Sequence, residues 1–135
     1  MSLLRRLRDS LREPLLAGVD FEERERVEVH AAILARKKML RGVFDDIYRL
    51  LLRLDERHLS GEGKRVENGA GESRFRELCP GLLLTDLVPA PHLDMVLDAQ
   101  AMALPDRSVR AFYGLNCFHH FPDPRAFFRE LERVL

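Results

Sequence analysis

The spacing of apolar residues changes near residue 60, from a helical period to short runs of strand length. From Asp20 to about Arg57, apolar residues recur every three or four positions, and this spacing predicts helices. Gly42 lies within this stretch and indicates a break between two helices. The apolar stripe that we expect to be buried consists of Leu40, Phe44, Ile47, Leu51 and Leu54.

Beyond a polar linker from Leu59 to Lys64, three short apolar runs each end in an acid. These acids are Glu67, Asp86 and Asp98, and a fourth apolar run extends from Val109 to Asn116. Strands separated by helical segments predict an α/β fold with a parallel sheet. We therefore divide the chain into a helical cap, residues 1–60, and a sheet domain, residues 61–135.

The first strand runs into a Gly-x-Gly turn made of Gly69, Ala70 and Gly71. Glycine permits positive φ and carries no Cβ, so a ligand could lie against bare backbone at the carboxyl end of the strand. A dinucleotide fingerprint needs a third glycine three positions later, where this chain has Arg74. The turn therefore indicates a cofactor cradle that does not bind a pyrophosphate.

Two later acids suit a nucleoside. Asp86 lies nineteen positions after Glu67, where a carboxylate could accept hydrogen bonds from two ribose hydroxyls. Asp98, with the backbone of Ala99, could meet the edge of a base. Each acid also has a structural interpretation, because aspartate often stabilises the turn that follows it.

With the segment His119-His120-Phe121-Pro122-Asp123-Pro124 after the fourth run, residues 66–135 resemble the first half of a class I S-adenosylmethionine-dependent methyltransferase. The resemblance implies a Rossmann-like sheet with S-adenosylmethionine as cofactor. Residues 33–52 also resemble the helices that precede the sheet in that family. Asn68 and Ser73 depart from the family pattern, which favours an apolar residue and a third glycine there. The implied cofactor-binding residues are Glu67, Gly69, Ala70, Gly71, Asp86, Asp98, Ala99 and Asn116.

His119 and His120 are the candidate catalytic residues. Methyl transfer is a direct displacement, so the protein mainly positions the acceptor, and an imidazole could remove the acceptor's proton. A structural role for both is the alternative, because adjacent side chains tend to project in different directions. The pair does not predict a metal site, because the sequence has no third ligand at suitable spacing.

The last segment predicts a helix that Asp123 caps and that has Pro124 in its first turn. Its expected apolar face comprises Phe127, Phe128, Leu131, Val134 and Leu135. The resembled family continues with further strands, so the sheet is expected to be truncated after its fourth strand, which would form an open edge. An open edge favours a homo-oligomer.

Two functions stay open at this point. The first is an enzyme that methylates an unidentified small-molecule acceptor, with weak or no activity in the isolated chain because part of the acceptor wall would be missing. The alternative is a non-catalytic, truncated methyltransferase-like module for binding or oligomerisation.

The composition agrees with one small domain. The 135 residues are 46% hydrophobic and 33% charged with zero net charge, which argues against a nucleic-acid partner. Cys79 and Cys117 lack metal-site spacing and are expected to be reduced core residues of a cytoplasmic protein.

The amino terminus combines leucines at helical spacing, from Leu3 to Leu15, with four arginines between them. Charge breaks the apolar stretch, which excludes a secretory signal, and no transmembrane run is present. The alternatives are a transit peptide, a membrane-surface helix, and a helix that lies on its own domain or on a partner.

Overall fold

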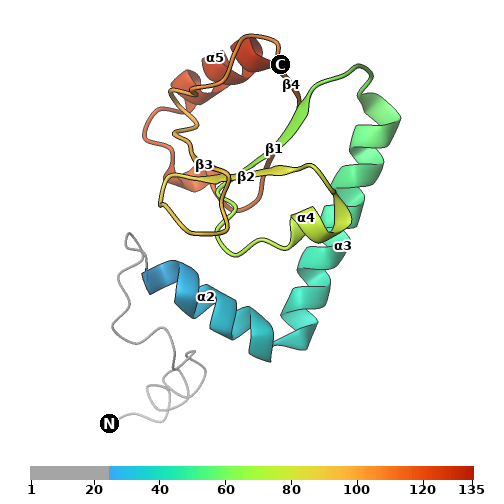
Figure 1. Ribbon diagram of the computed structural model, residues 1–135, viewed down its shortest axis with the longest axis vertical. Coiled ribbons are helices and arrows are strands. Elements are labelled where there is room, and N and C mark those ends of the chain that lie inside the picture. Colours follow the sequence, from blue (N-terminus) through green and yellow to red (C-terminus); the bar gives the residue numbers. More distant parts are fainter. Residues whose placement is uncertain (1–24) are drawn as a thin grey trace, which may run out of the picture.

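The computed structural model describes residues 25–135, in which helices cover both faces of a small sheet (Figure 1). The leucine- and arginine-rich segment near the amino terminus lies outside these residues. The elements in chain order are α2 (Glu25–Arg36), α3 (Lys38–His58), β1 (Lys64–Asn68), α4 (Phe75–Leu78), β2 (Leu83–Asp86), β3 (Met95–Val96), β4 (Val109–Gly114), the 3₁₀ helix η2 (Phe118–His120) and α5 (Pro124–Val134).

The break between the first two described helices is at Lys37, so the prediction of a break at Gly42 was wrong. Lys37 has φ −99° and ψ 78°, a conformation that no helix continues through. Gly42 lies inside α3 instead. A single glycine in a helix costs about 1 kcal/mol relative to alanine, which the packing of a 21-residue helix can outweigh.

The face that α3 turns toward the sheet also differs from the predicted stripe. Its two buried residues are Tyr48 and Asp55, while Leu40 and Leu54 are 38% and 44% exposed. Phe44 and Leu51 pack partly against the core, as expected. The prediction failed because it counted only aliphatic and phenylalanine positions, whereas hydrogen bonds make a buried tyrosine and a buried aspartate stable.

Asp55 fixes α3 to the sheet. Its carboxylate accepts hydrogen bonds from Arg65 Nε of β1 at 2.5 Å, from Arg110 Nη2 of β4 at 2.9 Å and from the Tyr113 hydroxyl at 2.6 Å. Burial raises the pKa of Asp55, but these three donors outweigh burial and hold the pKa below its ordinary value. The interaction joins α3 to the next element, β1, and to β4, whose Arg110 is 55 positions away.

All strand pairs are parallel, and the strand order is β3-β2-β1-β4. The predicted α/β fold with a Rossmann-like parallel sheet is therefore confirmed. β1 lies between β2 and β4, so the carboxyl ends of the strands meet at one edge of the sheet. In the part of the chain that the structure describes, β4 has a neighbour on one side only. It ends at Gly114, two residues before the predicted end.

Each face of the sheet carries its own apolar cluster. On one face, Tyr48 of α3 and Phe75 of α4 pack with Tyr113 of β4. On the other, Phe127 and Val134 of α5 pack with strand residues. Figure 1 shows this arrangement, with α5 on the opposite side of the sheet from α3 and α4. The two clusters leave the carboxyl edge of the sheet free for a site.

The last helix begins as predicted. The Asp123 carboxylate accepts a hydrogen bond from Arg125 N at 2.9 Å, and Pro124 occupies the first turn. Phe127 and Val134 are buried, but Phe128 and Leu135 are more than half exposed, so the predicted apolar face was too wide. No helix within residues 25–135 is both long and apolar enough to cross a membrane.

Candidate functional site

A cavity of about 860 Å³ opens where the strands end. Side chains and backbone from α2, α3, the loops after β1 to β4, and η2 surround it. All the residues that the sequence suggested for a site contribute to its wall, namely Glu67, Gly69, Ala70, Gly71, Asp86, Asp98, Ala99, Asn116, His119 and His120. The fold therefore brings together residues from four separate segments of the chain.

The Gly-x-Gly turn has the backbone that its sequence predicts. Gly69 and Gly71 have φ of 67° and 48°, values that favour glycine. A Cβ on Gly69 would lie 2.7 Å from Cys117 Cβ, so the turn packs directly against the loop that follows β4. A Cβ on Gly71 would meet nothing within 4 Å. Gly69 thus serves close packing, and Gly71 leaves open space beside the cavity.

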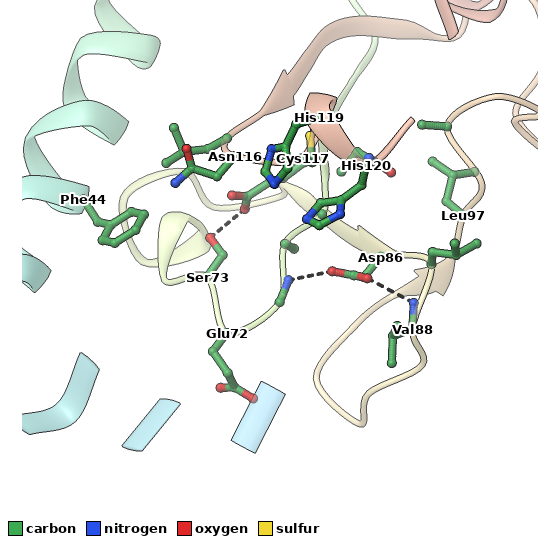
Figure 2. Close-up of a pocket in the computed structure, with 18 of the residues that line it drawn as sticks. Phe44, Glu72, Ser73, Asp86, Val88, Leu97, Asn116, Cys117, His119 and His120 are labelled. Atoms are coloured by element: carbon green, nitrogen blue, oxygen red, sulfur yellow. Dashed lines mark hydrogen bonds between the residues drawn. The ribbon is translucent and has the colours of Figure 1, made fainter. Parts of the chain in front are cut away.

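Asp86 ties the ends of two strands together. Its carboxylate accepts hydrogen bonds from Gly71 N and Val88 N, both at 3.0 Å (Figure 2). The residue is only 5% exposed and still lines the cavity. These bonds hold the carboxylate at the edge of the cavity, where a ligand's hydroxyl groups would meet it.

Glu67 is the most perturbed acid of the site. It is 3% exposed, and burial raises its pKa to about 7, although the Ser73 hydrogen bond and the positive charge of Arg76 oppose the increase. The Ser73 hydroxyl donates to Glu67 Oε2 at 2.7 Å. A buried acid that titrates near neutrality can change charge when a cationic group binds beside it.

Asp98 and Ala99 form the part of the wall that follows β3. Asp98 Oδ1 accepts a hydrogen bond from Gln100 N at 2.8 Å, which is the turn-stabilising role that the sequence left open as an alternative. Ala99 is 3% exposed. Gln100 was not predicted from the sequence; its Oε1 accepts from Asp123 N at 2.7 Å and joins this turn to α5.

The segment after β4 places Asn116 and both histidines at the cavity. Asn116 has φ 57°, a left-handed conformation that asparagine adopts more readily than most residues. The ring centroids of His119 and His120 lie 4.0 Å apart, and both rings are beside the cavity in Figure 2. The expectation that adjacent side chains diverge was therefore wrong here, because the 3₁₀ turn of η2 draws them together.

Neither cysteine forms a disulfide in the described residues. Cys79 is buried, as expected, but Cys117 is half-buried and lines the cavity, so its assignment to the core was wrong. Burial raises the pKa of both thiols. No group of three or more metal-binding side chains occurs within residues 25–135.

The first sixty residues were expected to cap this end of the sheet, but the sequence analysis did not name the residues that they contribute to the wall. Phe44 and Tyr48 of α3 line the cavity, and the Tyr48 hydroxyl lies 3.2 Å from Ser73 Oγ. Asn68, at the end of β1, is 5% exposed, and its Oδ1 has no hydrogen-bond partner in the described residues. The helical period places Tyr48 on the same face as Phe44 and Leu51, so its position at the wall could have been predicted from the sequence.

Comparison with known proteins identifies one segment of the chain. Residues 77–135, which run from within α4 to the end of α5, match a family model described as "Methyltransferase domain". No curated protein and no solved structure gave a significant match. The glycine turn and Glu67 precede the matched segment.

Proposed function

Residues 77–135 are part of a class I S-adenosylmethionine-dependent methyltransferase-like domain, and on this premise we propose that the chain binds S-adenosylmethionine and methylates a small-molecule acceptor. The observation that carries the proposal is the single cavity on which the glycine turn, Glu67, Asp86 and Asp98 converge. A parallel sheet binds its ligand at this edge. The resemblance and the geometry therefore indicate the same site.

The residues present suit this cofactor. Asp86 lines the cavity with a carboxylate that suits the ribose hydroxyls, and the turn at Gly71 leaves open space against backbone. We assign Asp98 and Ala99 to the adenine edge and include Asn116 in the site, because all three line the same cavity. Glu67 supplies a carboxylate for the amino group of the methionine moiety.

When bound, S-adenosylmethionine supplies an electrophilic methyl group on a sulfonium. The chain's main contribution is then to hold the acceptor in line, which can be worth roughly 7–11 kcal/mol when reactants are well oriented. The aromatic wall formed by Phe44 and Tyr48 is placed to position an acceptor. His119 or His120 would take the acceptor's proton where the acceptor carries one.

Calorimetry with Asp86→Ala tests the cofactor assignment. Hydrogen bonds to a charged acceptor contribute about 1.5–3 kcal/mol each, so the variant should bind S-adenosylmethionine at least tenfold more weakly. Asp106→Ala is the matched control, because Asp106 is exposed and pairs with Arg133 away from the cavity. It should bind as the unmodified chain does.

A second ligand separates ribose recognition from support of the loop, since Asp86 also accepts from Gly71 N. With the 2′,3′-dideoxy analogue, Asp86→Ala should cost much less affinity. An equal loss for both ligands would limit Asp86 to a loop role. Absence of binding by the folded, unmodified chain would refute the proposal, and binding without methyl transfer to any hydroxyl, amine or thiol acceptor would favour the non-catalytic module.

A further inference from the structure

We propose that Ser73 and Tyr48 are positioning residues that hold the Glu67 carboxylate for a cationic amino group, so that α3 is a functional part of the cofactor site. The inference rests on the proposed function and adds two residues to it. Neither belongs to the glycine turn, and Ser73 stands where the resembled family often has a third glycine.

Ser73 is fixed on two sides. Its hydroxyl donates to Glu67 Oε2 at 2.7 Å, and its oxygen accepts a hydrogen bond from Phe75 N at 3.1 Å, at the start of α4. A glycine at this position could make neither side-chain contact. The serine therefore links the strand-end acid to the backbone of the next helix.

Tyr48 supports the same serine from α3. Its hydroxyl lies 3.2 Å from Ser73 Oγ, within hydrogen-bond distance. Its ring stacks on Phe75, with centroids 4.6 Å apart and planes 10° from parallel. Tyr48 is 5% exposed and Phe75 is fully buried, so the ring is held firmly. Packing thus sets the position of the hydroxyl that contacts Ser73.

The second oxygen of Glu67 is left for a ligand. In the described part of the chain, Asn68 Oδ1 is the only fully enclosed side-chain oxygen or nitrogen without a hydrogen-bond partner. Glu67 lines the cavity, and within residues 25–135 the hydrogen bond that its side chain accepts from Ser73 is to Oε2, not to Oε1. An unshared carboxylate oxygen with little exposure suits a positively charged donor.

The charges around Glu67 do not already neutralise it. Arg76 is the cation whose charge lowers its pKa, and Arg76 itself pairs with Asp94. Arg74 is similarly engaged with Glu77. The other titratable groups that face this region from the elements packed around it are Arg41, Asp45 and Tyr48 of α3, Glu72, Cys79, Asp86, Asp98, Cys117, His119 and His120.

Carbon-13 NMR of glutamate-labelled protein, without ligand, measures the titration of Glu67 directly. The unmodified chain should titrate near pH 7. Ser73→Ala removes a hydrogen bond to the charged form, so its midpoint should rise by about one unit. Ser73→Thr keeps the hydroxyl and should restore the midpoint. Tyr48→Phe keeps the stacking and should give a smaller rise, because the tyrosine hydroxyl polarises the serine.

Tyr113→Phe is the matched control. It removes a buried tyrosine hydroxyl whose partner is Asp55, so it should lower stability without moving the Glu67 midpoint. An unchanged midpoint in folded Ser73→Ala would overturn the proposal. An equal rise in Tyr113→Phe would also overturn it, because general loosening would then explain the result.

Ligand binding provides the second measurement. At pH 7, Ser73→Ala should bind S-adenosylmethionine about fivefold more weakly, because the ionised fraction of Glu67 falls from about one half to about one tenth. Methylthioadenosine lacks the amino group and should bind both forms equally. Equal weakening of both ligands would refute a role toward the amino group. Failure of the unmodified chain to bind either ligand would refute the proposed function, while the NMR titration would still test the contact.

Discussion

At the residue scale, the two glycines of the first turn share a backbone conformation but differ in their surroundings. Both have positive φ, which costs an alanine about 1–2 kcal/mol. Only Gly69 would bring a Cβ within 2.7 Å of another carbon, Cys117 Cβ. Gly69 therefore allows two loops to pack closely together, and Gly71 leaves open space beside the cavity.

We expect Gly69→Ala to lower the free energy of unfolding by about 3 kcal/mol, and Gly71→Ala by about 1 kcal/mol. Urea denaturation of the two variants measures the difference. Adding Cys117→Gly to Gly69→Ala removes the clashing Cβ and should recover the excess loss. Equal destabilisation by both single variants would show that the contact with Cys117 relaxes freely.

At the element scale, α3 is attached to the sheet at two points along its length. The Asp55 carboxylate joins it to β1 and β4, and Tyr48 joins it to α4 and to Ser73, which follows the glycine turn. The second point lies at the cavity, whereas the first lies near the opposite ends of the strands. The helix is thus held rigidly enough for its aromatic side chains to form one wall of the site.

Asp55→Ala should lower the free energy of unfolding at pH 7 by about 3 kcal/mol, because it leaves Arg65 and Arg110 without their carboxylate. Asp46→Ala, which removes an exposed pair with Arg49 in the same helix, should cost no more than about 0.5 kcal/mol. Chemical denaturation compares them, and equal losses would contradict a special role for Asp55.

The difference should depend on pH. The pKa of folded Asp55 is lowered, so its stabilising contribution is present above the pKa of the unfolded chain and is lost as pH falls through the folded value. Repeating the denaturation at decreasing pH below about 4 should therefore reduce the penalty of Asp55→Ala. A penalty that stays constant down to the lowest accessible pH would show that ionisation of Asp55 contributes little.

At the scale of the whole molecule, the edge of the sheet at β4 and one face of α3 are open in the described chain. β4 has one strand neighbour, and α3 exposes an apolar stripe on the side away from the sheet. Its members, in order along the helix, are Met39, Val43, Leu50 and Leu54, with exposed fractions of 87%, 52%, 47% and 44%. Apolar stripes and unpaired strand edges both favour association.

We predict a dimer or larger species at micromolar concentrations, measured by light scattering coupled to size-exclusion chromatography. Leu50→Lys should shift the mass toward the monomer if the stripe on α3 forms the interface. Leu135→Lys, at a leucine of similar exposure beyond α5, should leave the mass unchanged. An unchanged mass in Leu50→Lys would indicate that the edge of β4 forms the interface. A monomeric unmodified chain would contradict the prediction.

The amino-acid sequence by itself determined the alternation of strands and helices, the parallel sheet, the positive φ of Gly69 and Gly71 and the cap at Asp123. These features depend on local preferences and on hydrophobic period, which neighbouring residues largely set. The grouping of the acids at the strand ends could also be predicted from the sequence, because the carboxyl ends of parallel strands meet at one edge.

Only the tertiary structure decided which polar groups lie inside. The burial of Asp55 depends on donors 10 and 55 positions away, and the contact between Ser73 and Tyr48 spans 25 positions. The proximity of the histidine rings and the exposure of Cys117 to the cavity likewise depend on how the β4 loop packs. A buried polar side chain is stable only if it has hydrogen-bond partners. Here those partners lie at distant positions in the sequence, so the local pattern of residues does not predict them.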